Sequence, residues 1–363
     1  MIHPPLRCLL GGFMGRSLFR VVIGLAIAAA LVVGTVTLTD TKVGPLPDTA
    51  PGYRVVGMQA AHRPEGLLLH LWYPARDGQI ELIGQNALFY GFHGRRDAPP
   101  DGLVHPLVVL SHGSGGNAER LGWIASTLAS AGMIVAAVNH PGTTSGNSLP
   151  DRTVMPWERV DDLKAILDRM QDDPPAALRP DMTRVGALGF SLGGGSVLLL
   201  GGARLSKAAF LAYCDRNIGK DDCGWLAEGG VDLSVIDAER YEQDNQDPRV
   251  KAVVAVDPAL SQAMTRDSLP RLGPSLIINL GKVEDVPAAM RADHLAAEIP
   301  GGEFLAVPGA AHFSFLARCS GFGVAVIALA GDDNICSDWG LRDREAVQTE
   351  IGAAVTTFLA NRL

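Results

Sequence analysis

The chain has 363 residues, of which 47% are hydrophobic and 19% are charged, and its formal net charge at pH 7 is −8. This composition excludes wholesale disorder, because it supplies enough apolar surface for a sizeable core. It shows no basic patch of the kind that nucleic-acid-binding proteins carry, so we expect no nucleic-acid partner.

The N-terminal residues 1–39 differ in composition from the rest of the chain. Arg7, Arg16 and Arg20 are the only charged residues before Asp40, and residues 21–39 read VVIGLAIAAALVVGTVTLT. A basic stretch followed by an apolar one predicts either a cleaved signal peptide or an uncleaved membrane anchor. Either segment would place the remainder outside the cytoplasm, in an exported protein that residues 21–39 could anchor to the membrane.

The Pro- and Gly-containing residues 40–52 are predicted to form a linker, and residues 53–363 one domain. Short apolar strands and helices then alternate, which is typical of a parallel sheet covered on both faces. The predicted strands are 67–73, 106–112, 133–140, 184–190, 250–258, 274–280 and 303–309. The predicted helices are 117–132, 157–170, 192–203, 286–299 and 344–361. The polar residues 203–249 interrupt this alternation and are predicted to be an insert that covers the sheet edge like a lid.

Ser191 is the candidate nucleophile. It lies in Gly189-Phe190-Ser191-Leu192-Gly193, which fits G-x-S-x-G between a predicted strand and a predicted helix. Such a sharp turn exposes the hydroxyl at a helix N-terminus, where the partial positive charge favours an oxyanion. A phosphate-binding loop is the weaker interpretation, because no lysine occurs between Lys164 and Lys207. A tight turn with a buried serine remains an alternative.

Two backbone N–H groups are candidates for an oxyanion hole. One belongs to Leu192, the residue after the predicted nucleophile. The other belongs to Ser114 in the sequence SHGSGG at residues 111–116, which follows an earlier apolar strand. A plain glycine-rich turn is the alternative interpretation of that second sequence.

His312 is the candidate general base. Only His294 and His312 follow Ser191 in the chain, and the order nucleophile, acid, histidine is that of α/β-hydrolases. His294 lies within a predicted helix and is expected at the surface. His312 directly follows the last predicted strand, from where its ring could reach the serine.

Three carboxylates compete for the position of the triad acid. Asp257 closes an apolar strand, where a carboxylate costs desolvation unless it has a partner. Glu284 and Asp285 follow the next strand, which is the commoner location in this fold, but they lie in a polar stretch. We favour Asp257 and keep the other two open.

Four cysteines follow Cys8, which belongs to the N-terminal segment. In an oxidising compartment they are expected to pair, and the local pairs Cys214–Cys223 and Cys319–Cys336 need the least rearrangement of the chain. Neither these spacings nor any His/Glu pattern fits a metal site, so we predict no metal and no organic cofactor.

Five sequences in this order resemble the platelet-activating-factor acetylhydrolases and the dienelactone-hydrolase-like proteins related to them: SHGSGG, MIVAAVNHPG, GFSLGG, AVVAVDPAL and PGAAHFSF. The resemblance begins near Leu67 and implies an α/β-hydrolase fold. In the acetylhydrolase branch it implies a triad of Ser191, Asp257 and His312, with Ser114 as an oxyanion donor. Other dienelactone-like relatives imply Glu284 or Asp285 as the acid.

The predicted function is hydrolysis of a small carboxylic ester, a short-acyl ester or a lactone, through an acyl-enzyme. An amidase or peptidase on the same scaffold, and a non-catalytic binding protein, are the alternatives. His140 lies in a resembling sequence and is expected to be a structural histidine at a turn rather than a pocket wall. Trp157 and Arg159 are predicted either to line the pocket or to serve ordinary capping and packing.

Overall fold

The structure is a computed structural model that describes residues 47–330, 335–338 and 341–363. The predicted signal peptide or anchor, residues 1–39, lies outside the described residues, as does most of the predicted linker. In the described ranges, no helix combines the length and the apolar character that crossing a membrane requires. The first strand begins at Gly52, and the domain boundary at residue 53 stays a prediction.

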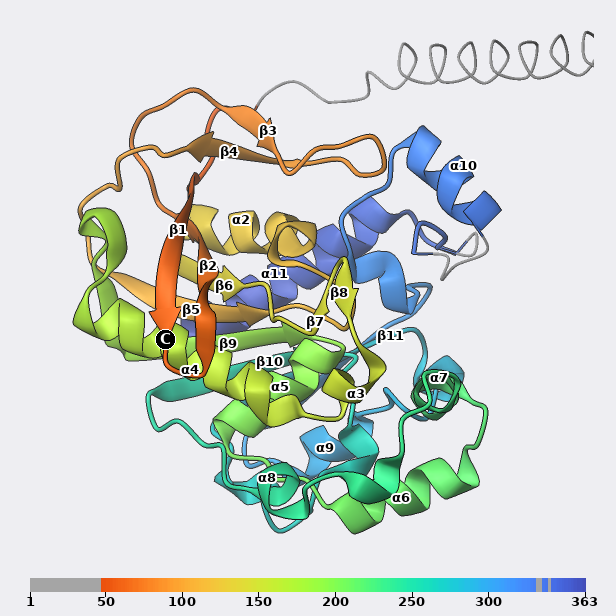
Figure 1. The fold of residues 1–363 in the computed structure, drawn as a ribbon. Helices are drawn as coiled ribbons and strands as arrows, with labels where there is room; N and C mark the ends of the chain where they lie inside the picture. The colour runs from red at the N-terminus through yellow and green to blue at the C-terminus, as the bar shows by residue number, and fades with distance from the viewer. Residues whose placement is uncertain (1–46, 331–334, 339–340) are drawn as a thin grey trace, which may run out of the picture.

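A ten-stranded mixed sheet forms the centre of the molecule, in the order β12-β11-β10-β9-β5-β6-β2-β1-β4-β3 (Figure 1). The six strands from β12 to β6 in this order are parallel, whereas β2 pairs antiparallel with both β6 and β1. The strands are β1 Gly52–Ala60, β2 Arg63–Tyr73, β3 Glu81–Ile83, β4 Phe92–Arg96, β5 His105–Ser111, β6 Ile134–Val138, β9 Pro180–Phe190, β10 Val250–Val256, β11 Ser275–Leu280 and β12 Gly302–Val307, with a separate pair β7 Thr143–Thr144 and β8 Asn147–Ser148.

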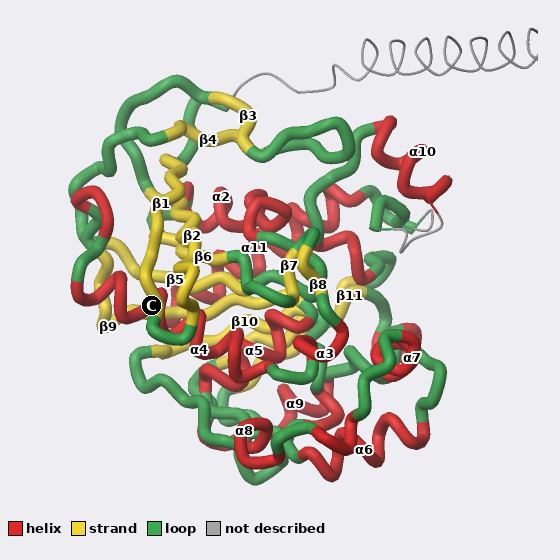
Figure 2. The backbone as a smooth tube through the Cα atoms, viewed as in Figure 1, coloured by secondary structure: helices red, strands yellow, loops and turns green. Residues whose placement is uncertain are grey.

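Helices cover both faces of this sheet, as predicted. Alternate residues of β5 belong to two different cores: Leu107 and Val109 to one, Val108 and Leu110 to the other. Figure 2 shows the strands between the two helical layers. One layer holds α2 Gly122–Ser130 and α11 Arg344–Arg362, and the other holds α4 Pro156–Asp172, α5 Leu192–Gly201 and α9 Asp293–Glu298.

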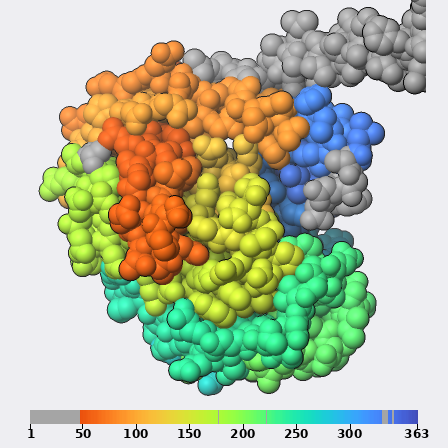
Figure 3. All heavy atoms as spheres, in the orientation of Figure 1, coloured from red at the N-terminus to blue at the C-terminus, as the bar shows by residue number. Residues whose placement is uncertain are grey.

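The predicted insert at 203–249 contains the helices α6 Lys207–Arg216, α7 Asp221–Glu228 and α8 Ala238–Glu242. Two further helices lie outside it, α3 Pro150–Thr153 and α10 Gly321–Ala330. Figure 3 shows the insert, in green and teal, along the lower part of the molecule next to the segment around α3, and α7 contacts α3. Both predicted disulfides, Cys214–Cys223 and Cys319–Cys336, are confirmed. The first closes a loop within the insert.

The helix predicted over 286–299 is wrong in its first half, because α9 begins only at Asp293. Side chains from β11 and from the segment after β10 bind the backbone groups that a longer helix would use. The Asn279 amide donates to the carbonyl of Met290 and accepts from the N–H of Ala292. The Ser261 hydroxyl donates to the carbonyls of Ala289 and Arg291. These tertiary hydrogen bonds compete with the helix, and no local sequence pattern reveals them.

Candidate active site

Ser191 occupies a sharp turn between β9 and α5. Its φ of 55° and ψ of −120° are unusual for a residue with a side chain and mark local backbone strain. Two hydrogen bonds hold this conformation: Ser191 N–H donates to the carbonyl of Val256 at 2.9 Å, and Ala259 N–H donates to the carbonyl of Ser191 at 3.0 Å. A Cβ atom at Gly189 or Gly193 would collide with neighbouring backbone, which explains the glycines of the motif.

His312 and Asp257 form a hydrogen bond at the same edge of the sheet. His312 begins the short 3₁₀ helix η7 His312–Phe315, after β12, and its Nδ1 lies 2.9 Å from Oδ2 of Asp257. The Asp257 side chain is only 1% exposed, whereas that of His312 is 20% exposed. Since a carboxylate accepts hydrogen bonds, Nδ1 carries the proton and Nε2 is left as the acceptor.

The other oxygen of Asp257 is held by the next strand. Oδ1 accepts from the Asn279 amide and from the Leu280 N–H, each at 2.9 Å. Glu284 and Asp285 lie exposed in the 3₁₀ helix η6 Val283–Asp285. Of the three candidate carboxylates, the structure therefore brings Asp257 to His312.

The imidazole of His312 lies over the strand end that carries Ser191. Its ring centroid is 4.7 Å from that of Phe190, the residue before Ser191, and Phe190 stacks on Phe315 at 5.0 Å. The hydrogen bonds of the described residues include none between the Ser191 hydroxyl and His312. Such a contact commonly tightens only when substrate binds. We refer to Ser191, His312 and Asp257 as the elbow set. His294, the other candidate histidine, lies on α9.

The loop after β5 lies directly beside the elbow set. Ser111 pairs with Gly189 across the β5–β9 ladder, and a Cβ atom on Gly113 would lie 3.1 Å from Cβ of Ser191. Ser114 is exposed, and its hydroxyl lies 3.4 Å from that of Thr153. Within the described residues, neither the N–H of Ser114 nor that of Leu192, the first residue of α5, donates to a protein acceptor. Both N–H groups are thus available to a ligand next to Ser191.

A second serine–histidine–aspartate chain lies beneath this loop. The Ser111 hydroxyl is 3.0 Å from Nε2 of His140, and Nδ1 of His140 is 2.9 Å from Oδ2 of Asp162. All three side chains are buried, and those of His140 and Asp162 are 0% exposed. We refer to Ser111, His140 and Asp162 as the buried set. The sequence analysis did not identify Ser111 and Asp162 as members of this set. The sequence offers only one indication of them: each is a polar residue where apolar ones prevail, Ser111 at the end of β5 and Asp162 on the buried face of α4.

The pKa values of His140 and Asp162 both lie below their ordinary values. Burial and the charge of Arg159 lower the pKa of His140 to about 4, so the ring is neutral at pH 7. Burial alone would raise the pKa of Asp162, but hydrogen bonds from His140, His62 and Arg63 hold it well below its usual range. His140 is thus a hydrogen-bonded structural histidine, as the sequence suggested.

Trp157 and Arg159, at the start of α4, are both buried. Trp157 is 7% exposed and packs in the core, with the Arg240 guanidinium 5.7 Å from its ring centroid. Arg159 is 1% exposed, and burial lowers the pKa of its guanidinium to about 9. It donates to Ser111, His112, Thr143 and Ser196.

Comparison with known proteins places these features in a family context. A family model described as "Platelet-activating factor acetylhydrolase, isoform II" matches residues 97–149. Among curated proteins, the cutinase est2 of Thermobifida alba is 27% identical over 136 residues, covering 36% of this chain and 42% of the cutinase. The cutinase cut1 of Thermobifida fusca is 26% identical over 178 residues, covering 47% and 52%. The chain spans about half the length of the curated relatives it matches.

A solved structure extends the likeness to most of the chain. The ferulic acid esterase from Streptomyces cinnamoneus superposes with a TM-score of 0.58 at 20% sequence identity, covering 88% of this chain and 92% of that one. At this identity the likeness shows the fold. The chain therefore has the α/β-hydrolase fold, and its predicted resemblance to the platelet-activating-factor acetylhydrolases is confirmed over residues 97–149.

Proposed function

We propose that this protein hydrolyses carboxylic esters through an acyl-enzyme on Ser191. The observation that carries the proposal is the hydrogen bond from His312 to the buried Asp257, placed beside the strained turn of Ser191. The names of the similar proteins, cutinases and a ferulic acid esterase, support the same class of reaction.

The proposed reaction has two halves, acylation and deacylation of Ser191, and the elbow set takes part in both. Nε2 of His312 accepts the proton of Ser191 as its oxygen attacks the ester carbonyl, and Asp257 stabilises the imidazolium that forms. The N–H groups of Ser114 and Leu192 donate to the oxyanion. The intermediate collapses to an acyl-serine and an alcohol that takes the proton from His312. Water, deprotonated by His312, then attacks the acyl carbon. The bond to Ser191 breaks, the carboxylic acid leaves, and the Ser191 oxygen takes the proton back from His312.

The proposed substrate is a short-acyl ester or a lactone, and no cofactor is needed for the steps above. The two disulfides support export to an oxidising compartment. Anchoring through residues 21–39 stays a prediction.

The test combines turnover with covalent labelling. The purified protein is expected to hydrolyse p-nitrophenyl acetate and butyrate and to react with a fluorophosphonate probe, with mass spectrometry locating the probe on Ser191. The Ser191→Ala variant is the control and should do neither. A folded protein that neither turns over nor labels would favour the binding-only alternative. Amide turnover at a rate near that of the ester would favour the amidase alternative.

A further inference from the structure

One buried cation joins the two segments that carry the proposed oxyanion donors. The Arg159 guanidinium donates from Nη2 to the hydroxyl of Ser111, the last residue of β5, at 3.1 Å and to the carbonyl of His112 in the loop that follows. Its Nε donates to the Ser196 hydroxyl on α5 at 3.2 Å. Its Nη1 donates to the Thr143 hydroxyl at 2.6 Å. A single rigid group thus contacts the loop, the nucleophile helix and β7.

Both contacts lie close to the proposed donors along the backbone. The carbonyl of His112 precedes the Gly113–Ser114 peptide, whose N–H is one proposed donor. On the other side, the Ser196 hydroxyl that accepts from Arg159 itself donates to the carbonyl of Leu192 at 2.8 Å. Leu192 supplies the second proposed donor. The guanidinium therefore connects the two N–H groups through one or two hydrogen bonds on each side.

Two further hydrogen bonds, one from His140 after β6 and one from His112 itself, restrain the loop after β5. The N–H of His140 donates to Nε2 of His112 at 3.1 Å, so Nε2 carries no proton. Nδ1 of His112 must therefore carry it and donates to the carbonyl of Gly113 at 2.7 Å. Burial, followed by the charge of Arg159, keeps the pKa of His112 well below its ordinary value, which maintains this neutral form.

We propose that Arg159 is a positioning residue that sets the separation of the Ser114 and Leu192 N–H groups; this inference rests on the proposed ester hydrolysis. Burying a cation costs more than burying an apolar side chain of similar size, so packing alone does not account for an arginine here. A guanidinium offers five donors in a fixed plane, which a lysine does not. Because oxyanion donors act only when they lie about 2.7–3.1 Å from the developing charge, small shifts of this loop should slow the reaction.

The test uses Arg159→Lys and Arg159→Met, assayed with p-nitrophenyl butyrate. Loss of one oxyanion donor costs roughly 100-fold or more in kcat, and we expect a fall of about that size with KM changed by less than about twofold. Affinity for an alkyl trifluoromethyl ketone, which forms a tetrahedral adduct with the serine, should fall in parallel with kcat. Arg159→Lys should restore little, because it keeps the charge and loses the planar fork.

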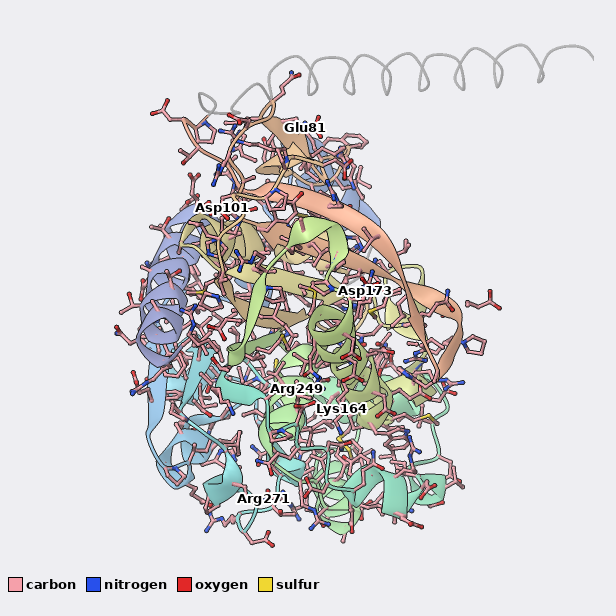
Figure 4. All side chains as sticks on the ribbon, turned by 90° about the vertical axis from the view of Figure 1, so that its left-hand side faces the viewer. Glu81, Asp101, Lys164, Asp173, Arg249 and Arg271 are labelled. Carbon is pink, nitrogen blue, oxygen red and sulfur yellow. A yellow bond between two sulfur atoms is a disulfide. The ribbon has the colours of Figure 1, made fainter. Side chains whose placement is uncertain are left out.

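Arg249 provides the matched control. It directly precedes β10, whereas Ser191 directly follows the parallel neighbour β9, so the two residues lie at opposite ends of these strands. Figure 4 shows Arg249 beside Lys164 of α4. Its guanidinium forms ion pairs with Asp168 at 2.8 Å and Asp247 at 2.7 Å. Arg249→Met should leave kcat and the ketone affinity unchanged.

The outcomes separate the two proposals. If the Arg159 variants lose thermal stability but keep kcat per folded molecule, the positioning role is overturned and ester hydrolysis stands. If the wild-type protein has no turnover and Ser191 does not label, both fail. Should the Arg159 variants not fold, Ser196→Ala removes the link to Leu192 and leaves the bonds of the guanidinium to Thr143, Ser111 and His112 in place. An unchanged kcat in that variant would contradict the inference, and a fall of about tenfold would support it.

Discussion

The elbow set and the buried set contain the same three residue types, and in both the histidine Nδ1 lies 2.9 Å from the aspartate Oδ2, yet their surroundings differ. In the elbow set the histidine is 20% exposed, and two N–H groups near the serine have no protein acceptor within the described residues. In the buried set the serine hydroxyl accepts from the Arg159 guanidinium, and its histidine and aspartate are fully enclosed.

This difference teaches that the hydrogen-bond chain alone does not identify a nucleophile. Ser111 is fully buried, and its oxygen already accepts from the Arg159 guanidinium. Ser191 has a strained backbone that projects its side chain from the turn, at the start of α5. Access and donors, rather than the triad geometry, distinguish the proposed catalytic serine from the structural one.

Removing each serine tests the comparison most directly and carries the largest expected effect. Ser191→Ala should lower kcat for p-nitrophenyl butyrate by roughly 10⁴-fold or more, because no other group can form the acyl-enzyme. Ser111→Ala should keep kcat within about tenfold while losing about 1–3 kcal/mol of unfolding free energy, since it leaves the buried Nε2 of His140 without its partner. Steady-state kinetics and urea unfolding measure the two quantities. Equal losses of kcat would refute the distinction.

Removing the charge of the elbow carboxylate is expected to have the next largest effect. Asp257→Asn should lower kcat about 10²–10⁴-fold, because an amide no longer holds His312 in the required tautomer. The double variant Glu284→Gln/Asp285→Asn is the control and should retain wild-type kcat, since both carboxylates are exposed. If Asp257→Asn kept wild-type activity and the double variant lost it, the triad acid would be Glu284 or Asp285.

Removing the charge of the buried carboxylate should affect stability instead of turnover. Asp162→Asn removes the acceptor of His62, Arg63 and His140, and we expect a loss of about 3–5 kcal/mol of unfolding free energy. Asp168→Asn breaks an ion pair in which the carboxylate is 62% exposed and should cost less than about 1 kcal/mol. Similar urea midpoints for the two variants would contradict the proposed difference.

The smallest expected effect is a pH dependence from His140. Its pKa is about 4 in the folded protein and 6.5 in its ordinary state, so between these values only the unfolded chain binds the proton. The unfolding free energy should therefore fall as pH drops from 6.5 toward 4, by up to about 1.4 kcal/mol per pH unit from this group. His140→Gln should show a shallower slope in urea unfolding at several pH values. Parallel slopes would show that another group titrates there.

The sequence predicted the elements whose local pattern matches their final environment. The apolar parallel strands and the turn at Ser191 follow from runs of buried residues and from glycines that no other residue could replace. By contrast, the short β3 and β4 at the sheet edge and the helices of the insert have weak periodicity and were not predicted. The first half of the helix over 286–299 was mispredicted because Asn279 and Ser261, distant in sequence, bind its backbone.

The order of the motifs by itself determined the fold class and the candidate serine and histidine, since each depends on local chemistry and on which strand end a residue follows. The two cysteine pairs were favoured because their members lie close together in the sequence. Only the tertiary structure decided which carboxylate reaches His312, because Asp257 and Glu284 both follow strands and differ in the direction their side chains take. The contacts on which the proposal for Arg159 rests are likewise visible only in the tertiary structure. Four acceptors from separate segments converge on that guanidinium only after the sheet and its helices have assembled.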